Sequence, residues 1–204
     1  PPPRFQAEDG IRDGPQCLVG SEMCIRDRLT PEQVKRHKFL SKLGPDVLAK
    51  DVDTDAVLAR ITDPRFARRQ LHAILLDQGF VAGLGNYLRS EILFVASLHP
   101  SRRAGELSAI EADALANCIL SVSRQAYRTG GITNDLHRVK VAKAKGMRRA
   151  QYRHHVFSRG GRRCWTCQTQ IRREVLGGRN IFFCPSCQTG PKDSSSSNGA
   201  RRCG

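Results

Sequence analysis

The stretch that decides the fold is Leu75–Phe94, which reads LLDQGFVAGLGNYLRSEILF. Apolar residues recur at helical spacing up to Asp77, the pattern breaks at Ala82–Gly85, and it resumes through Tyr87–Leu93. The stretch therefore predicts a helix, a tight glycine turn and a second helix.

The glycine turn has two features of an anion-binding site. Gly83 and Gly85 carry no Cβ, so the turn can adopt unusual φ/ψ angles and its backbone can approach a ligand closely. Asn86 lies where the second helix is predicted to start, beside free backbone N–H groups at the positive end of the helix dipole. The alternative is a glycine-linked pair of helices that only packs.

The chain as a whole is strongly basic. Its 204 residues include 34 Lys and Arg against 19 Asp and Glu, which gives a formal net charge of +15. Such an excess favours a polyanion as partner, usually nucleic acid. A membrane surface is the alternative, but the sequence shows no long apolar run, lipidation motif or signal peptide, and we expect no membrane association.

Four cysteines have the spacing of a metal site. Cys164, Cys167, Cys184 and Cys187 form two C-x2-C pairs separated by sixteen residues. Four thiolates fill a tetrahedral Zn²⁺ and leave no open position, so the pattern predicts one structural zinc ion rather than a catalytic one. Two disulfides in a secreted protein are the alternative, which the basic charge and the lack of a signal sequence disfavour.

The residues between the two cysteine pairs predict a β-hairpin. Ile171–Phe183 reads IRREVLGGRNIFF, and its strand-like ends flank Gly177-Gly178-Arg179, the expected hairpin tip.

Other local signals predict further helices. Capping boxes are present at residues 30–33 and 108–111, and the second of these opens a helix that ends at Gly130-Gly131. A short helix is expected over Asp55–Ile61, and another from Pro64 into Asp77. The helix after the glycine turn is expected to end at Leu98-His99, before a proline.

Taken together, these motifs resemble the formamidopyrimidine-DNA glycosylase and endonuclease VIII family of base-excision repair enzymes. Their order and spacing match that family over Leu29–Gln188, and the forms LTPEQ at residues 29–33 and GLGNYLR at residues 83–89 are closer to endonuclease VIII. In this family the helix–two-turn–helix element holds the phosphates that flank a damaged nucleotide. The resemblance implies a monomer that binds double-stranded DNA with an oxidised base or abasic site, in the bacterial cytoplasm at the nucleoid.

The resemblance also implies the fold class. The chain is expected to be mainly α, with a helix–two-turn–helix DNA-binding domain followed by a small β-hairpin zinc finger, and without the family's N-terminal β-sandwich. Residues 6–28 resemble translated sequencing adapter and are excluded from this interpretation. The predicted divisions are a leader over 1–28, the helical domain over 29–131, a basic connecting segment over 132–157, the zinc finger over 158–188 and a disordered tail over 189–204.

The catalytic groups of the family do not match the start of this chain. The family uses an N-terminal proline amine, followed at once by a glutamate, to form an iminium with the deoxyribose C1′. This chain begins Pro1-Pro2-Pro3-Arg4, with no glutamate beside the proline. The intact protein is therefore expected to be a DNA glycosylase and abasic-site lyase, whereas this chain alone is predicted to be inactive in excision. The alternatives are a DNA-binding module with no catalytic activity and an RNA-associated protein, and the four-cysteine array disfavours the latter.

By resemblance, several basic residues contact DNA. Lys42 aligns with an arginine that touches DNA; a lysine can neutralise a phosphate but lacks the bidentate fork, and a solvated surface lysine is the alternative. Arg179 corresponds to the finger arginine that enters DNA at the lesion and is assigned a proton-donor role in δ-elimination. Because a guanidinium rarely gives up a proton, we expect Arg179 to position and stabilise the phosphate, with a generic phosphate contact as the alternative. The stretch Tyr152–Arg159 resembles the strand that leads into the family's zinc finger.

Overall fold

The computed structural model describes residues 32, 36–38, 40–188 and 190. The chain divides into two units, Pro1–Ser41 and Lys42–Gly204, and the features discussed below lie in the second. The described elements, in chain order, are η2 (Leu40–Lys42), α2 (Thr54–Ile61), α3 (Pro64–Ala67), α4 (Leu71–Ile74), α5 (Asn86–Val95), η3 (Ala104–Glu106), α6 (Ala109–Arg128), α7 (Leu136–Ala144), α8 (Arg149–Tyr152), β1 (Arg172–Leu176) and β2 (Arg179–Phe183).

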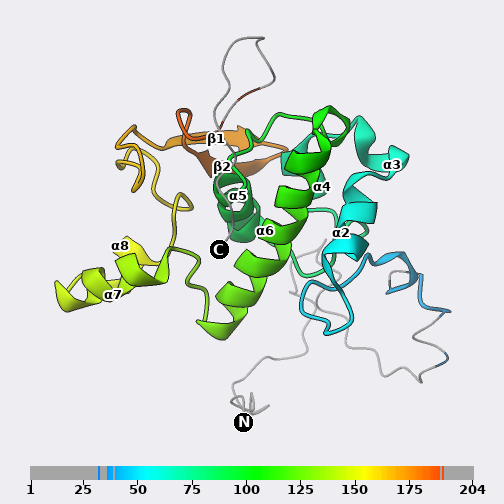
Figure 1. Ribbon diagram of the computed structural model, residues 1–204, viewed down its shortest axis with the longest axis horizontal. Coiled ribbons are helices and arrows are strands. Elements are labelled where there is room, and N and C mark those ends of the chain that lie inside the picture. Colours follow the sequence, from blue (N-terminus) through cyan, green and yellow to red (C-terminus); the bar gives the residue numbers. More distant parts are fainter. Residues whose placement is uncertain (1–31, 33–35, 39, 189, 191–204) are drawn as a thin grey trace, which may run out of the picture. The chain divides into compact units, whose positions relative to one another are not determined.

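The second unit is a layer of helices with one antiparallel hairpin against it. Figure 1 shows the long helix α6 beside α2 and α5, with β1 and β2 next to α5. The seven α-helices of the described residues and the two-stranded sheet confirm the expected mainly α fold with a small β-hairpin. The predicted capping box at residues 30–33 lies, except for Glu32, outside the described residues.

Helix α6 forms as its sequence predicts. The Ser108 side chain accepts a hydrogen bond from the Glu111 N–H, and the Glu111 carboxylate accepts one from the Ser108 N–H. At the other end Gly130 and Gly131 adopt φ of 64° and 96°, and the Gly131 N–H reaches back to the Ala126 carbonyl. Between these ends, Leu115 and Ile119 are among the fully buried side chains of the main core.

Glu111 also pairs with a buried cation, Arg102, which lies in the loop between α5 and α6. Arg102 is 2% exposed and donates to both Glu111 carboxylate oxygens, at 2.5 and 3.0 Å. The hydrogen bond from Arg102 is the main reason why the pKa of Glu111 falls to about 2. The capping box therefore connects the start of α6 to the loop that follows α5.

The helix predicted from Pro64 into Asp77 is wrong as a continuous element. It is divided into α3 and α4, because Gln70 between them is extended, with φ −71° and ψ 146°. The Leu71 N–H bonds to the Arg102 carbonyl at 2.8 Å, so this part of the backbone pairs with a distant loop and not with its own helix. A long-range pairing of this kind leaves no periodic signal in the sequence.

Two further expected boundaries also differ from the structure. Helix α5 ends at Val95, before the predicted Leu98-His99, because Ser97 takes a left-handed conformation with φ 58°. Residues 153–159 form bends and turns and not the strand implied over Tyr152–Arg159. The physical cause of this second difference is the buried carboxylate of Glu91, which accepts the backbone N–H groups of residues 155–157.

No helix within the described residues combines the length and the apolar character needed to span a bilayer.

Candidate nucleic-acid interface and metal centre

The turn formed by Gly83–Asn86 is stabilised by two hydrogen bonds to the side chain of Gln78. Gln78 accepts the Gly83 N–H through Oε1 at 3.0 Å and donates from Nε2 to the Leu84 carbonyl at 2.9 Å. Gly83 has φ 91°, as the predicted unusual turn requires, whereas Gly85 is extended and has no atom within 4 Å of a Cβ built on it. The space beside Gly85 is therefore open to a ligand.

Helix α5 begins at Asn86, as predicted, and no side chain hydrogen-bonds its first turn as a cap. The first backbone N–H groups of a helix have no intrahelical partner and lie at the positive end of its dipole. This geometry suits a phosphate oxygen at the start of α5.

The Asn86 side chain is directed toward the hairpin. Its Nδ2 donates to the Asn180 carbonyl at 3.2 Å, and its Oδ1 accepts from Arg89 at 2.7 Å. Arg89 donates to the same Asn180 carbonyl at 3.1 Å and to the His72 carbonyl at 3.2 Å. These bonds connect the turn, through α5, to the residue next to Arg179.

Arg89 is a buried cation. Burial, together with the nearby charge of Arg179, lowers the pKa of Arg89 to about 10, so its guanidinium stays protonated near neutral pH. Its three carbonyl and amide acceptors compensate part of the cost of burying the charge.

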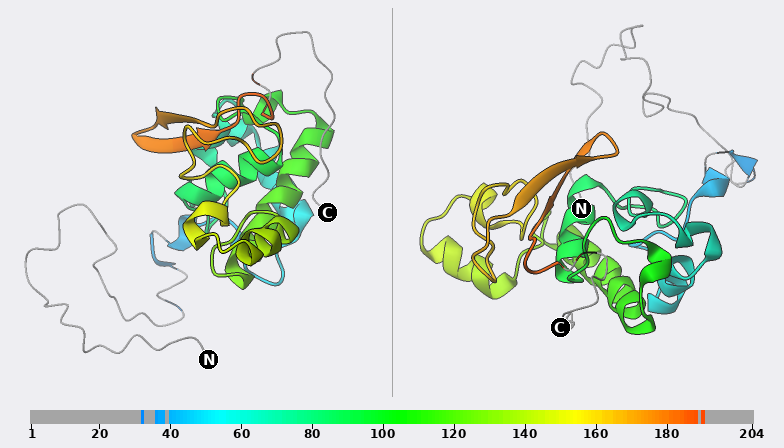
Figure 2. Two further views of the ribbon diagram at one scale, coloured as in Figure 1. Left: turned by 90° about the vertical axis from the view of Figure 1, so that its left-hand side faces the viewer. Right: turned by 90° about the horizontal axis from the view of Figure 1, so that it is seen from above.

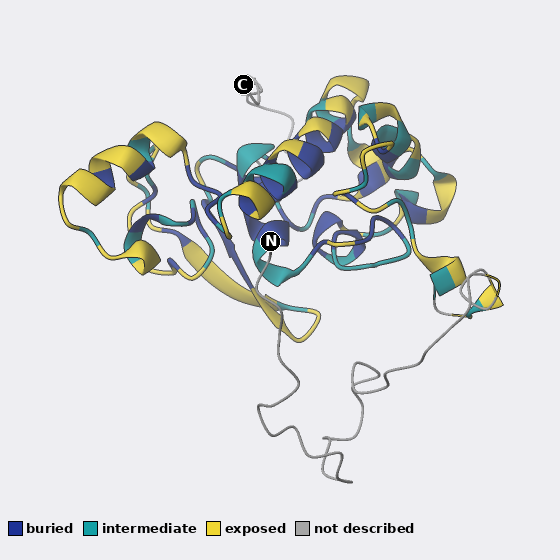
Figure 3. Cartoon of the chain, turned by 90° about the horizontal axis from the view of Figure 1, so that it is seen from below, coloured by how far each residue is buried: buried dark blue, intermediate teal, exposed yellow. Residues whose placement is uncertain are grey.

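The hairpin places Arg179 at its tip. Leu176 pairs with Arg179 across the two-residue turn, in which Gly177 and Gly178 have φ of 59° and 73°. Positive φ at both central residues is characteristic of a type I′ turn, which explains the two glycines. Figures 2 and 3 show that the hairpin projects from the helical layer and that its tip is exposed. In the described part of the chain, neither an ion pair nor a hydrogen bond restrains the Arg179 guanidinium.

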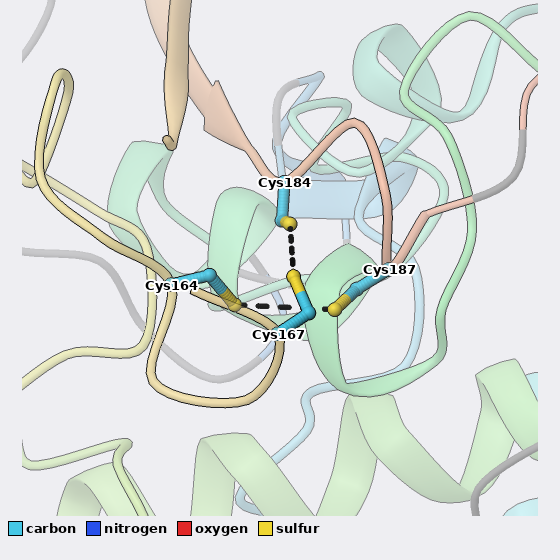
Figure 4. Close-up of side chains that lie close together, drawn as sticks. All are labelled: Cys164, Cys167, Cys184 and Cys187. Carbon is cyan, nitrogen blue, oxygen red and sulfur yellow. Dashed lines mark hydrogen bonds between the residues drawn. The ribbon is translucent and has the colours of Figure 1, made fainter. Parts of the chain in front are cut away.

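The four cysteines gather at the base of the hairpin. Their sulfur atoms lie within 4.8 Å of one another, with Cys167 and Cys184 3.4 Å apart and Cys164 and Cys187 3.9 Å apart (Figure 4). All four are free thiols, so the disulfide alternative is wrong. A tetrahedral ion with metal–sulfur bonds of about 2.3 Å has its ligands roughly 3.8 Å apart, which these distances fit.

Comparison with known proteins agrees with this geometry. The H2TH domain of formamidopyrimidine-DNA glycosylase matches residues 43–137. Endonuclease 8 of Klebsiella pneumoniae is 44% identical over 162 residues, and Endonuclease 8 of Escherichia coli K12 is 41% identical; each match covers 79% of this chain and 58% of the relative. The chain thus spans little more than half the length of these relatives.

The fold is similar to that of solved complexes with DNA. A Lactococcus lactis Fpg bound to DNA with an abasic site and another bound to DNA with FAPY-dG both give a TM-score of 0.63 at 25% identity. Each match covers 79% of this chain and 57% of the solved chain.

The chain belongs to the formamidopyrimidine-DNA glycosylase and endonuclease VIII family, as a C-terminal part of it.

Within this family framework, Lys42 lies beside the segment that leads into the turn. The Gly44 N–H bonds to the Gln78 carbonyl at 2.8 Å, and Asp46 forms an isolated bridge with Ala82. Lys42 is exposed at the end of η2. The structure thus brings the backbone around Lys42 next to the turn, while the Asn180 carbonyl, beside Arg179 on β2, bonds to Asn86 from the hairpin side.

The sequence did not identify Arg60 and Gln78 as supports of the turn. Arg60 donates to the carbonyls of Gly79 and Phe80, the latter at 3.1 Å, and so connects α2 to the backbone that leads into the turn. Arg60 belongs to no recognisable motif, and its bonds span about twenty positions of sequence. Gln78 lies within the stretch Leu75–Phe94, but apolar periodicity does not show what its amide bonds to.

The second cysteine pair is attached to the loop that follows α5. Gln188 accepts the Cys184 N–H through Oε1 at 2.8 Å and donates from Nε2 to the Leu98 carbonyl at 2.9 Å. Because Gln188 is 1% exposed, both bonds are shielded from water. Hydrogen bonds around metal ligands orient them, so Gln188 would help to hold the Cys184–Cys187 loop in register with the helices.

A buried carboxylate on α5 fixes the segment that enters the finger. Glu91 is 0% exposed and accepts the backbone N–H groups of His155, Val156 and Phe157 at 2.7–2.8 Å, together with the Thr133 hydroxyl. These donors are used by the carboxylate, so they cannot form the ladder of the expected strand over residues 152–159.

The donors also keep Glu91 ionised. Burial acts to raise its pKa, but the neighbouring histidines, the Thr133 hydroxyl and the backbone N–H groups outweigh it, and the net pKa is lowered. Burial lowers the pKa of His154 to about 4 and also lowers that of His155.

Replacing Glu91 by Gln tests this attachment. The amide keeps the size of the side chain but offers one acceptor oxygen to donors that now share two. Because hydrogen bonds to a buried charged group are lost, we expect Glu91→Gln to lower the free energy of unfolding by on the order of 3 kcal/mol.

Thermal and urea unfolding measure this change. Glu174→Gln is the matched control, since Glu174 is exposed on β1, and a surface change of this kind stays within about 0.5 kcal/mol. Equal stability of the Glu91→Gln variant and the wild-type chain would contradict the assigned role.

Proposed function

We propose that this chain binds double-stranded DNA containing an abasic site or an oxidised base, as the DNA-binding part of a base-excision DNA glycosylase and abasic-site lyase. The observation that carries the proposal is the set of hydrogen bonds among Asn86, Arg89 and Asn180. These bonds connect the start of α5, whose geometry suits a phosphate, to the strand that presents Arg179. The related structures with abasic-site and FAPY-dG DNA support this class of partner.

Each DNA-binding residue has a physical role in this proposal. The backbone of Gly83, Gly85 and Asn86 offers N–H donors to a phosphate, and the open space beside Gly85 admits it. Lys42 adds a point charge near the same segment. Arg179 extends an unrestrained guanidinium to the damaged strand, where planar donors can bind a phosphate in bidentate fashion.

The catalytic part of the proposal is narrower. In the whole protein, base excision and strand cleavage would use the proline amine and glutamate of the family, and in this chain Pro1 is followed by Pro2. Arg179 would stabilise phosphate charge during δ-elimination, since a guanidinium is a poor proton donor. We propose that the chain alone binds lesion-bearing DNA without releasing a base.

The four cysteines would hold one structural Zn²⁺. The donor set of four thiolates at tetrahedral spacing fits zinc, and it leaves no position for substrate or water. Such an ion fixes the base of the hairpin and takes no part in bond breaking. We further propose that the protein acts as a monomer in the bacterial cytoplasm, at the nucleoid, where its DNA substrate and reduced thiols are available.

The variant Arg179→Ala tests the DNA contact. We expect its affinity for an abasic-site duplex to fall roughly 10- to 100-fold, because a charge-assisted hydrogen bond is worth about 1.5–3 kcal/mol. Fluorescence anisotropy at fixed salt measures the dissociation constant. Arg172→Ala, an exposed arginine at the other end of the hairpin, is the matched control and should change affinity much less.

Three results would contradict the proposal. The wild-type chain could bind abasic and undamaged duplexes equally, it could prefer structured RNA, or Arg172→Ala could weaken binding as much as Arg179→Ala. Base release from an oxidised duplex by this chain would overturn the narrower statement about excision.

Metal content tests the zinc site. We expect about one zinc per chain by elemental analysis, and a strong chelator should lower the melting temperature because the metal stabilises the hairpin base. Cys184→Ser should lose the metal, whereas Cys203→Ser, outside both C-x2-C pairs, should keep it. Retention of zinc by the Cys184→Ser variant at wild-type affinity, or loading with iron in place of zinc, would contradict this assignment.

A further inference from the structure

Helices α7 and α8 carry a second exposed basic surface, outside the turn and the hairpin tip. The sequence from Leu136 to Arg173 contains twelve Lys and Arg and no Asp or Glu. We define the basic helix surface as the four exposed side chains Lys140, Lys143, Lys145 and Arg148. Figure 3 shows α7 largely exposed, and Figure 1 shows α7 and α8 apart from α2–α4.

The fold does not neutralise these charges. The ion pairs of the described residues all involve side chains within residues 60–111. None of them includes a side chain of the basic helix surface. Lys140 and Lys143 are neighbours on one helix face, where like charges repel and destabilise the helix. An uncompensated surface of this kind attracts a polyanion, and binding it releases counterions.

Hydrogen bonds and a small apolar core hold α7 and α8 in place. Asn134 is 0% exposed; it donates to the Tyr152 carbonyl at 2.8 Å and accepts from the Arg138 guanidinium at 3.0 Å. Asp135 caps α7 by accepting the Arg138 N–H at 2.7 Å. A small separate core lies beneath the two helices: Ile132, Val139, Ala142 and Tyr152. The helices therefore hold their cations outward before any ligand binds.

The surface is also attached to the metal-binding loop. The guanidinium of Arg138 lies 5.7 Å from the centre of the Trp165 ring, and that of Arg159 lies 4.2 Å from it. Trp165 lies between Cys164 and Cys167, the two cysteines of the first C-x2-C pair. Cation–π contacts of this geometry are favourable, so α7 and the finger should bind DNA as one body.

We propose that the basic helix surface is a second phosphate-binding surface, which contacts duplex backbone outside the nucleotides held by the turn and Arg179. This rests on the proposed function, because it assumes that the chain binds duplex DNA. Lysine ammonium groups bind phosphates as point charges and do not read bases. The surface therefore adds affinity and salt dependence, and it adds nothing to the discrimination between damaged and undamaged DNA.

The salt dependence of binding tests the inference. We would compare the wild-type chain, Lys140→Gln/Lys143→Gln/Lys145→Gln and the matched control Lys50→Gln/Arg68→Gln/Arg128→Gln. The control removes the same charge from exposed positions elsewhere. The dissociation constants of abasic and undamaged duplexes would be measured across a salt series. Each lost phosphate contact lowers the slope of log K against log salt by about 0.9.

The expected result is a slope lower by about 2 to 3 for the α7 triple variant on both duplexes, with an unchanged ratio of their affinities. The control should lose much less slope. An α7 triple variant with the wild-type slope, or with the same loss as the control, would overturn the inference while leaving the proposed function intact. A wild-type chain that binds no duplex would overturn both.

A folding defect can be separated from a lost contact. If the triple variant shows no cooperative melting transition, Lys143→Gln alone replaces it, with an expected slope change of about 0.9. An unchanged slope for this single variant, with Lys140→Gln also unchanged, overturns the inference.

Discussion

One buried carboxylate is the constraint on which the arrangement of the helices and finger depends. Glu91 has no solvent exposure, so its charge persists only because three consecutive backbone N–H groups and a hydroxyl surround it. The backbone donors also need a partner, because without Glu91 the N–H groups of residues 155–157 would be left without an acceptor. Each partner therefore enforces the position of the other.

Helix α5 carries the contacts that position the turn and the hairpin relative to each other. Its first residue, Asn86, belongs to the phosphate-suited turn, Arg89 holds the hairpin at Asn180, and Glu91 holds the entry to the finger. The Phe182 N–H adds a longer bond to the Ser90 hydroxyl at 3.4 Å. All these contacts come from fewer than two turns of one helix, so the distance between the turn and Arg179 is set by a rigid element rather than by a linker.

The metal site complements this attachment. Four thiolates would determine the local fold of the hairpin base, but they do not by themselves determine where the hairpin points. Its orientation comes from α5 and from Gln188, which joins the Cys184 loop to the Leu98 carbonyl. A closed metal site of this type would contribute positioning and would leave no ligand position open for chemistry.

The sequence predicted the features that short-range patterns encode. The Ser108–Glu111 capping box, the Gly177-Gly178 turn and the C-x2-C pairs each involve residues a few positions apart, and all three formed as expected. Features that depend on distant partners were missed or wrong. Glu91 acts on residues about 65 positions later and so replaced an expected strand with turns, and the pairing of Leu71 with Arg102 interrupted an expected helix.

The basic segment shows a related difficulty. Its charge run was interpreted as a connecting segment over residues 132–157, yet α7 and α8 form there because Asp135 caps α7 and Asn134 is bonded to the Tyr152 carbonyl. Those contacts are made by one acidic residue, Asp135, and one uncharged residue, Asn134. The long run of basic residues that follows them in the sequence draws attention away from both. The positions of Lys42, the turn and Arg179 beside DNA remain predictions from resemblance, which the geometry supports.

Native-state hydrogen exchange of the backbone amides of residues 155–157 tests the central claim most directly. If Glu91 holds this segment to α5, these amides should exchange only with global unfolding, at the same free energy as the amides of Ile92 and Leu93. Exchange of residues 155–157 through a low-energy local opening, while the α5 amides stay protected, would show that the segment is not held by Glu91 and would contradict the account.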